Sequence, residues 1–67
     1  MTLKYVNANE QEQIVGEYQT MEDASKAIGD WCKTHRFKSY YQRWADFGNY
    51  YWCDFGSHVC FFRLYKT

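Results

Sequence analysis

The chain of 67 residues has no proline, only four glycines and only three cysteines. Because no proline-rich or low-complexity linker interrupts it, we expect one small domain spanning residues 1–67. An odd number of cysteines does not form a closed disulfide framework, so Cys32, Cys53 and Cys60 are expected to be reduced thiols. No apolar run approaches the ~20 residues of a membrane span, and the N-terminus lacks signal-peptide features. These absences predict a cytoplasmic protein with no membrane partner.

Aromatic side chains are abundant, at 22% of the residues. A domain of this size buries only roughly 60% of the surface that its unfolded chain exposes. The aromatics therefore exceed what a small core holds, and the excess is expected at a surface. The charge is also uneven: residues 1–30 hold two lysines against six carboxylates, and residues 31–67 hold six cations against two carboxylates. This division suggests a polarised molecule, although ordinary solvated faces explain it equally well.

The first half of the chain predicts a hairpin followed by one helix. Residues 3–6 and 12–18 have the composition of short strands, and the asparagines between them favour a turn. Thr20 is suited to cap a helix by accepting from the backbone N–H of Asp23. Apolar residues then recur at spacings of three and four, which indicates an amphipathic helix with one buried stripe. The predicted stripe contains Met21, Ala24, Ile28, Trp31 and His35.

The second half contains the motif Trp-x-Asp-Phe-Gly twice, at Trp44 and again eight residues later at Trp52. Eight residues suit one short strand and one tight turn, so we expect strands near 38–45, 49–54 and 58–65. If each Asp-Phe-Gly forms a three-residue loop with glycine in the left-handed region, Ala45 opposes Asn49 and Cys53 opposes Ser57. One face then carries Tyr40, Trp44, Tyr50, Trp52, His58, Cys60, Phe62 and Leu64. The other face carries Tyr41, Arg43, Tyr51, Val59, Phe61, Arg63 and Tyr65.

These elements predict an α+β fold in the order ββαβββ. An N-terminal hairpin or strand precedes one amphipathic helix and a three-stranded antiparallel meander. The first face described above, which has no formal positive charge, is expected to pack under the helix. A loop of different length would change the pairing and exchange faces.

Three residue patterns in the chain are also found in metal sites or enzyme active sites. Cys32-x-x-His35 and His58-x-Cys60 together offer four zinc ligands, but no Cys-x-x-Cys knuckle is present and buried cysteine is a common small hydrophobe. Asp-Phe-Gly also occurs in protein kinases, yet the chain lacks the glycine-rich loop and the catalytic His-Arg-Asp segment. A Cys–His nucleophile has little room for a substrate pocket. We therefore expect no enzyme activity, no metal and no cofactor.

The segment from Trp52 through Asp-Phe-Gly-Ser-His to the paired phenylalanines Phe61 and Phe62 resembles the tails of small proteins from Gram-positive bacteria and their phages. The resemblance covers about a dozen residues. It implies an origin in a mobile element or its host, and it implies no activity or catalytic residue.

The face left uncovered by the helix is the predicted functional surface. Tyrosine, tryptophan and arginine dominate the binding energy of protein–protein interfaces. The sequence therefore predicts non-catalytic binding of a protein partner, with single-stranded nucleic acid as the alternative ligand because exposed aromatics and cations also stack bases. Weak self-association is a third interpretation, and a second small core closed by the N-terminal hairpin is a fourth. The predicted partner-binding residues are Tyr41, Arg43, Tyr51, Phe61, Arg63 and Tyr65.

Overall fold

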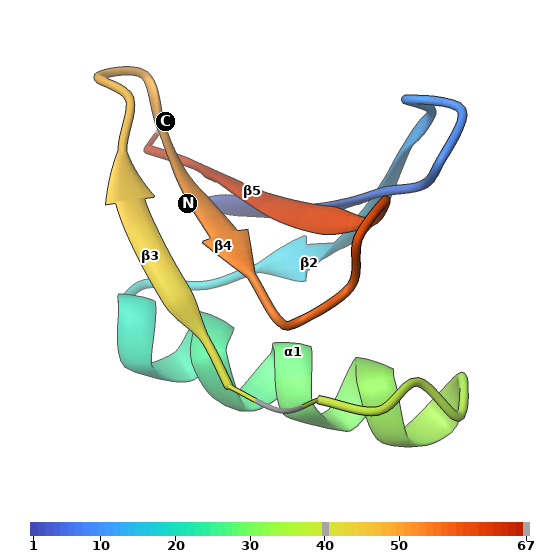
Figure 1. The fold of residues 1–67 in the computed structure, drawn as a ribbon. Helices are drawn as coiled ribbons and strands as arrows, with labels where there is room; N and C mark the ends of the chain where they lie inside the picture. Colours follow the sequence, from blue (N-terminus) through green and yellow to red (C-terminus); the bar gives the residue numbers. More distant parts are fainter. Residues whose placement is uncertain (40, 67) are drawn as a thin grey trace.

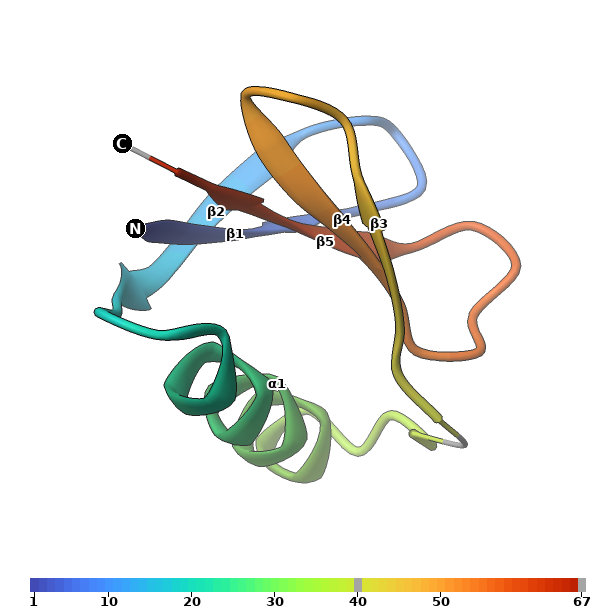
Figure 2. The same ribbon diagram turned by 90° about the vertical axis from the view of Figure 1, so that its left-hand side faces the viewer.

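The computed structural model describes residues 1–39 and 41–66. It confirms the α+β class and the predicted order of elements, with a single sheet that has α1 on one side (Figures 1 and 2). The elements are β1 (Thr2–Val6), β2 (Glu12–Glu17), α1 (Met21–Thr34), β3 (Arg43–Asp46), β4 (Tyr50–Asp54) and β5 (Phe61–Tyr65). The predicted strand at 38–45 begins later than expected, and Tyr40, assigned above to the helix-facing side, lies outside the described residues.

The sheet has five strands in the order β2-β1-β5-β4-β3, and all neighbours are antiparallel. The sheet is therefore larger than the three-stranded meander that the sequence predicts, because the N-terminal hairpin adds two strands to β5, β4 and β3. β1 pairs with β5 from Thr2 opposite Tyr65 to Val6 opposite Phe61, so the N-terminal hairpin continues the same sheet. β1 contributes Leu3 and Tyr5 to the core cluster, and Val6, on the opposite face of the strand, is also fully buried, so burial on both faces fixes the hairpin in place.

The helix begins and packs largely as its sequence predicts. The side chain of Thr20 accepts a hydrogen bond of 3.1 Å from the backbone N–H of Asp23. Ala24, Ile28 and Cys32 are the buried residues of α1, which identifies the stripe that meets the sheet. His35 was assigned to this stripe, but it is exposed and stacks on Trp31 with ring centroids 3.9 Å apart. The helix has ended by His35, so the helical period no longer places that side chain against the sheet.

The register predicted for β3 and β4 is wrong by three residues. Asp46 opposes Tyr51, and the backbone N–H of Phe47 donates to the carbonyl of Tyr50 at 2.9 Å. The turn is therefore formed by Gly48 and Asn49. Gly48 has a φ of +92°, which is open to glycine and disfavoured for other residues.

The register predicted for the second hairpin, between β4 and β5, is also wrong, and by more residues. Cys53 opposes Phe62 instead of Ser57, and residues 55–60 form the loop between β4 and β5. Both shifts are odd, so side chains of β4 exchange faces relative to the prediction. Tyr51 lies on the helix side with Cys53 and Leu64, whereas Trp52 opposes Arg63 on the other side.

The core lies between α1 and the sheet. It gathers apolar residues from β1, α1, β4 and β5 and from the loop that follows β4. Trp44 and Tyr51 pack against it as partly buried neighbours. The buried cluster is Leu3, Tyr5, Ala24, Ile28, Cys32, Cys53, Phe55, Phe62 and Leu64.

Candidate functional site

Aromatic rings from β4, β5 and the β3–β4 turn gather on the side of the sheet opposite α1. They follow from strand alternation, because Cys53 and Phe62 point to the core and their neighbours Trp52, Phe61 and Arg63 point away. We call this surface the aromatic face. It consists of Phe47, Tyr50, Trp52, Phe61, Arg63 and Tyr65.

The rings of the aromatic face contact one another across the strands. Phe47 stacks on Tyr50 with centroids 5.6 Å apart, and Tyr50 lies 5.5 Å from the ring of Tyr65. Trp52 lies 6.1 Å from Phe61 and 6.5 Å from Phe47, which joins the two groups of rings. Such separations are typical of favourable aromatic pairs. The face is therefore a continuous ring surface, and its outer member Phe47 is 60% exposed.

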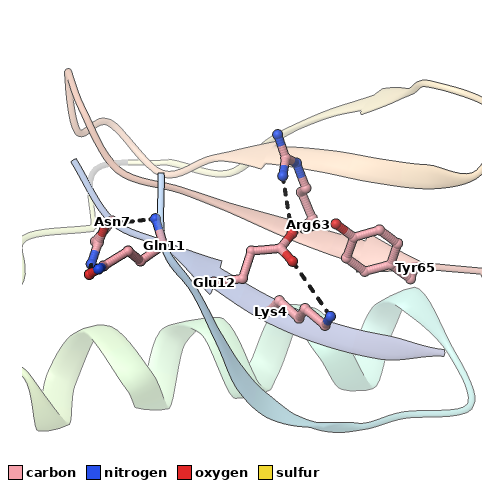
Figure 3. Close-up of polar contacts among 6 residues, drawn as sticks. All are labelled: Lys4, Asn7, Gln11, Glu12, Arg63 and Tyr65. Atoms are coloured by element: carbon pink, nitrogen blue, oxygen red, sulfur yellow. Dashed lines mark hydrogen bonds and ion pairs between the residues drawn. The ribbon is translucent and has the colours of Figure 1, made fainter. Parts of the chain in front are cut away.

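Arg63 lies at the centre of the aromatic face and is held from several sides. Its guanidinium carbon is 5.2 Å from the ring centroids of both Tyr50 and Phe61, within cation–π range. Its Nη1 donates to Oε2 of Glu12 at 3.0 Å (Figure 3). The Nε of Arg63 is buried and has no hydrogen-bond partner among the residues that the structure describes. The guanidinium group of Arg63 is thus oriented by contacts with Glu12, Tyr50 and Phe61.

Glu12 on β2 joins three strands through one carboxylate. The hydroxyl of Tyr65 donates to it, Arg63 pairs with it, and Lys4 Nζ lies 3.5 Å from its Oε1. The hydrogen bond from Tyr65, with those of Arg63 and Lys4, lowers the pKa of the Glu12 carboxyl below its usual value. The network fastens the edge strand β2 to β5 across β1.

We expect Glu12→Gln to lower the free energy of unfolding by about 1 kcal/mol at pH 7, because a partly exposed network of this kind contributes modestly. Since the folded pKa of Glu12 lies below the unfolded value, its contribution is present above pH ~4.5 and is lost as the pH falls through the folded pKa. Urea unfolding at pH 7 and pH 3 should show the difference between wild type and variant shrinking in acid. Glu17→Gln on the same strand is the matched control, and an equal effect of the two variants at pH 7 would contradict the role of Glu12.

The structure places the six predicted partner-binding residues in three locations. Phe61, Arg63 and Tyr65 lie together in the aromatic face. Arg43 is the first residue of β3, away from the β3–β4 turn, and it opposes Asp54. Tyr41 is exposed just before β3, and its hydroxyl lies 3.5 Å from Asp54 Oδ2.

Tyr51 is the member of that set on the other side of the sheet. It packs against the core, and Lys66 Nζ lies 4.6 Å from its ring centroid. Its assignment to the uncovered face was wrong because the predicted registers of β4 with both β3 and β5 were wrong. For the same reason the sequence missed Phe47, Tyr50 and Trp52. A turn centred on Gly48-Asn49, a pair that favours hairpins, was the signal that could have found them.

The four zinc candidates differ in environment. Cys32 is buried in the core, where burial raises the pKa of its thiol, and Cys60 is partly buried. His35 and His58 are exposed, the latter in the β4–β5 loop. Within residues 1–39 and 41–66, no group of three or more His, Cys, Asp or Glu side chains is arranged to hold a metal ion.

In the described part of the chain, no helix is both long enough and apolar enough to span a membrane. Searches against protein-family models, curated proteins and solved structures found no match for this sequence.

Proposed function

We propose that this protein is a non-catalytic binding protein that docks a protein partner on its aromatic face. The observation that carries the proposal is the clustering of rings from β4, β5 and the β3–β4 turn on the side of the sheet opposite the core. The helix α1 lies on the other side of the sheet (Figure 2). Tryptophan, tyrosine and arginine supply most of the energy in protein interfaces. A small accessory or regulatory protein of a phage or mobile element, acting in the cytoplasm, fits this mode of action.

The fixed position of Arg63 supports binding with little loss of entropy. An interfacial side chain with many rotamers costs about 0.5–1.5 kcal/mol when it is immobilised. Arg63 is already held by Glu12 and lies over the rings of Tyr50 and Phe61. The aromatic face therefore presents a preorganised cation among rigid rings, which suits a partner with an acceptor group beside an apolar patch.

Single-stranded nucleic acid is the less favoured ligand for this face. Base stacking would suit the rings, but strand binding also needs cations that track the phosphates. Glu12 lies against both Lys4 and Arg63 and offsets one of their two positive charges, which leaves this group with a net charge of only +1 (Figure 3). The electrostatic contribution expected from this face is consequently small.

The test compares Phe47→Ala and Trp52→Ala with Val59→Ala, an exposed apolar residue outside the aromatic face. Immobilised proteins would be used to recover partners from a bacterial host lysate, after circular dichroism has shown that each variant is folded. We expect a shared protein to be bound by wild type and Val59→Ala and recovered at least about tenfold less by both aromatic variants, as for interface hot spots.

Two arms of the experiment discriminate the alternatives. Labelled oligonucleotides are titrated at low and high salt, since binding through phosphates weakens steeply with salt. Sedimentation over a range of concentrations detects self-association. Equal recovery by all variants, or tight salt-sensitive oligonucleotide binding lost in Trp52→Ala, would contradict a protein partner at this face.

A further inference from the structure

A groove of about 720 Å³ runs between the edge strand β2 and the helix α1. It lies on the helix side of the sheet and is separate from the aromatic face. Figure 2 shows β2 at the margin of the sheet, curving toward the start of α1. The lining residues from α1 recur at spacings of three and four, so they form one stripe along the helix. That stripe is Asp23, Lys26, Ala27, Asp30, Trp31 and Thr34.

The free edge of β2 borders this groove. β2 has β1 as its neighbour on one side and no strand of the described chain on the other. Its outer backbone groups are therefore available to pair with another strand. Of the features that block such edges, β2 lacks proline and lysine but has a bulge and a glutamate at each end. The bulge opposite Leu3 and Lys4 bends the strand, which agrees with its curvature toward α1.

The charge of the groove favours a basic ligand. Glu17, Asp23 and Asp30 contribute three carboxylates, against the single lysine Lys26. Val15, Ala27 and Trp31 supply apolar surface between the charges. An extended chain that alternates basic and apolar side chains matches this arrangement, because successive side chains of a strand point to opposite sides.

The length of the groove also matches a short strand. The helical stripe from residue 23 to residue 34 spans roughly 17 Å at 1.5 Å per residue. Five or six extended residues cover about 17–20 Å. We propose that the groove binds an extended, lysine- or arginine-containing segment of a partner protein, which pairs with β2 as a sixth strand beside α1.

A second copy of the chain is a poorer occupant of the β2 edge. Antiparallel pairing of β2 with its own copy over the full strand would place Glu12 opposite Glu17 at both ends. Like charges directly opposite one another destabilise a strand pair. A basic partner segment would instead place cations opposite Glu12 and Glu17.

The experiment uses three defined peptides and the full chain. The probe is an acetylated, amidated hexapeptide of alternating lysine and valine. One control replaces each lysine by glutamate, and the other keeps the lysines but carries N-methyl groups on alternate backbone nitrogens, which blocks strand pairing. Binding is followed by NMR chemical shifts and by amide exchange of residues 12–17.

We expect the basic peptide to bind at least about tenfold more tightly than either control, with slowed exchange in β2, as for strand addition at a sheet edge. Asp23→Asn/Asp30→Asn should weaken binding by about tenfold. Glu22→Gln, on the same helix but outside the groove, and Phe47→Ala in the aromatic face should bind as wild type does.

Several results would overturn the inference. Equal binding of the N-methylated peptide would exclude strand pairing, and equal binding of the glutamate peptide would exclude charge recognition. Absence of shifts in β2 at millimolar peptide, or a dimer of the free chain whose interface maps to β2, would also reject it.

Discussion

Replacing Phe55 by alanine is expected to lower the free energy of unfolding by about 3–5 kcal/mol. Replacing Phe47, the equivalent residue in the first copy of the repeat, should cost less than about 1 kcal/mol. The two phenylalanines occupy the same place in Asp-Phe-Gly, but Phe55 is 1% exposed and Phe47 is 60% exposed. The comparison therefore isolates burial from local sequence.

Phe55 has this large effect because it fills the core at the end of β4. Its ring lies 5.4 Å from the buried Phe62 and 6.1 Å from Phe37, which follows α1. Truncation would leave a cavity where the helix end, the loop and the sheet meet. Phe47 instead stacks on Tyr50 at the surface, where water replaces the lost contact.

Urea unfolding at pH 7 with tryptophan fluorescence measures both values. A domain of this size has a total stability of only about 5–15 kcal/mol or less, so Phe55→Ala is accompanied by Phe55→Leu, which should fold and lose about 1–2 kcal/mol. Equal costs for Phe47→Ala and Phe55→Ala, or a negligible cost for Phe55→Leu, would show that the two copies are packed alike and that the described core is wrong.

The repeat shows what local sequence determines and what it does not. In both copies the aspartate accepts a hydrogen bond from the N–H of the glycine, at 2.8 Å for Asp46 and Gly48 and at 2.9 Å for Asp54 and Gly56. Both glycines have positive φ angles. These features were predictable because they depend on neighbouring residues alone.

Loop length was not predictable in the same way. After Gly56, the hydroxyl of Ser57 accepts from the N–H groups of Val59 and Cys60 and extends the loop. Pairing resumes with Phe62 opposite Cys53, and both side chains are fully buried. The register is therefore set by which residues fill the core under α1, a condition that involves the whole chain.

In the candidate site, too, the local features were predictable from the sequence and the pairing between strands was not. Phe61, Arg63 and Tyr65 lie in or beside one face because alternation within a strand is local. Tyr50 and Tyr51 were assigned to the wrong sides because their assignment needed the pairing between strands. The groove beside β2 was not predicted at all, since it requires the edge of the sheet and the stripe of α1 to be placed together.

Raising the pH from 9 to 12 is expected to remove most of the stability of the folded state. Burial raises the pKa of the Cys53 thiol to about 12. Burial, followed by the hydrogen bond with Cys60, raises the pKa of Tyr5 to about 12. Both groups lie in the core, where the ionised form is poorly solvated.

Stability falls as the pH rises because the pKa values of Cys53 and Tyr5 in the folded state lie above the ordinary values of these groups. The folded state holds these protons more tightly, so the contribution is fully present below pH ~9 for the thiol and pH ~10 for the phenol. It is lost as the pH rises toward the folded pKa values. Within that interval each group lowers the free energy of unfolding by about 1 kcal/mol per pH unit.

Urea unfolding at pH 8 and pH 11, in the presence of a reductant, measures this loss. Tyr5→Phe and Cys53→Ala should each show a smaller difference between the two pH values than wild type, even where Cys53→Ala is less stable at pH 8 through loss of packing. Tyr41→Phe removes a phenol from an exposed position and serves as the matched control for Tyr5→Phe. A wild-type stability that is unchanged at pH 11, or an equal loss in Tyr5→Phe and Tyr41→Phe, would refute ionisation of the core as the cause. The expected result would show that Tyr5 and Cys53 are buried in solution, as they are in the core cluster.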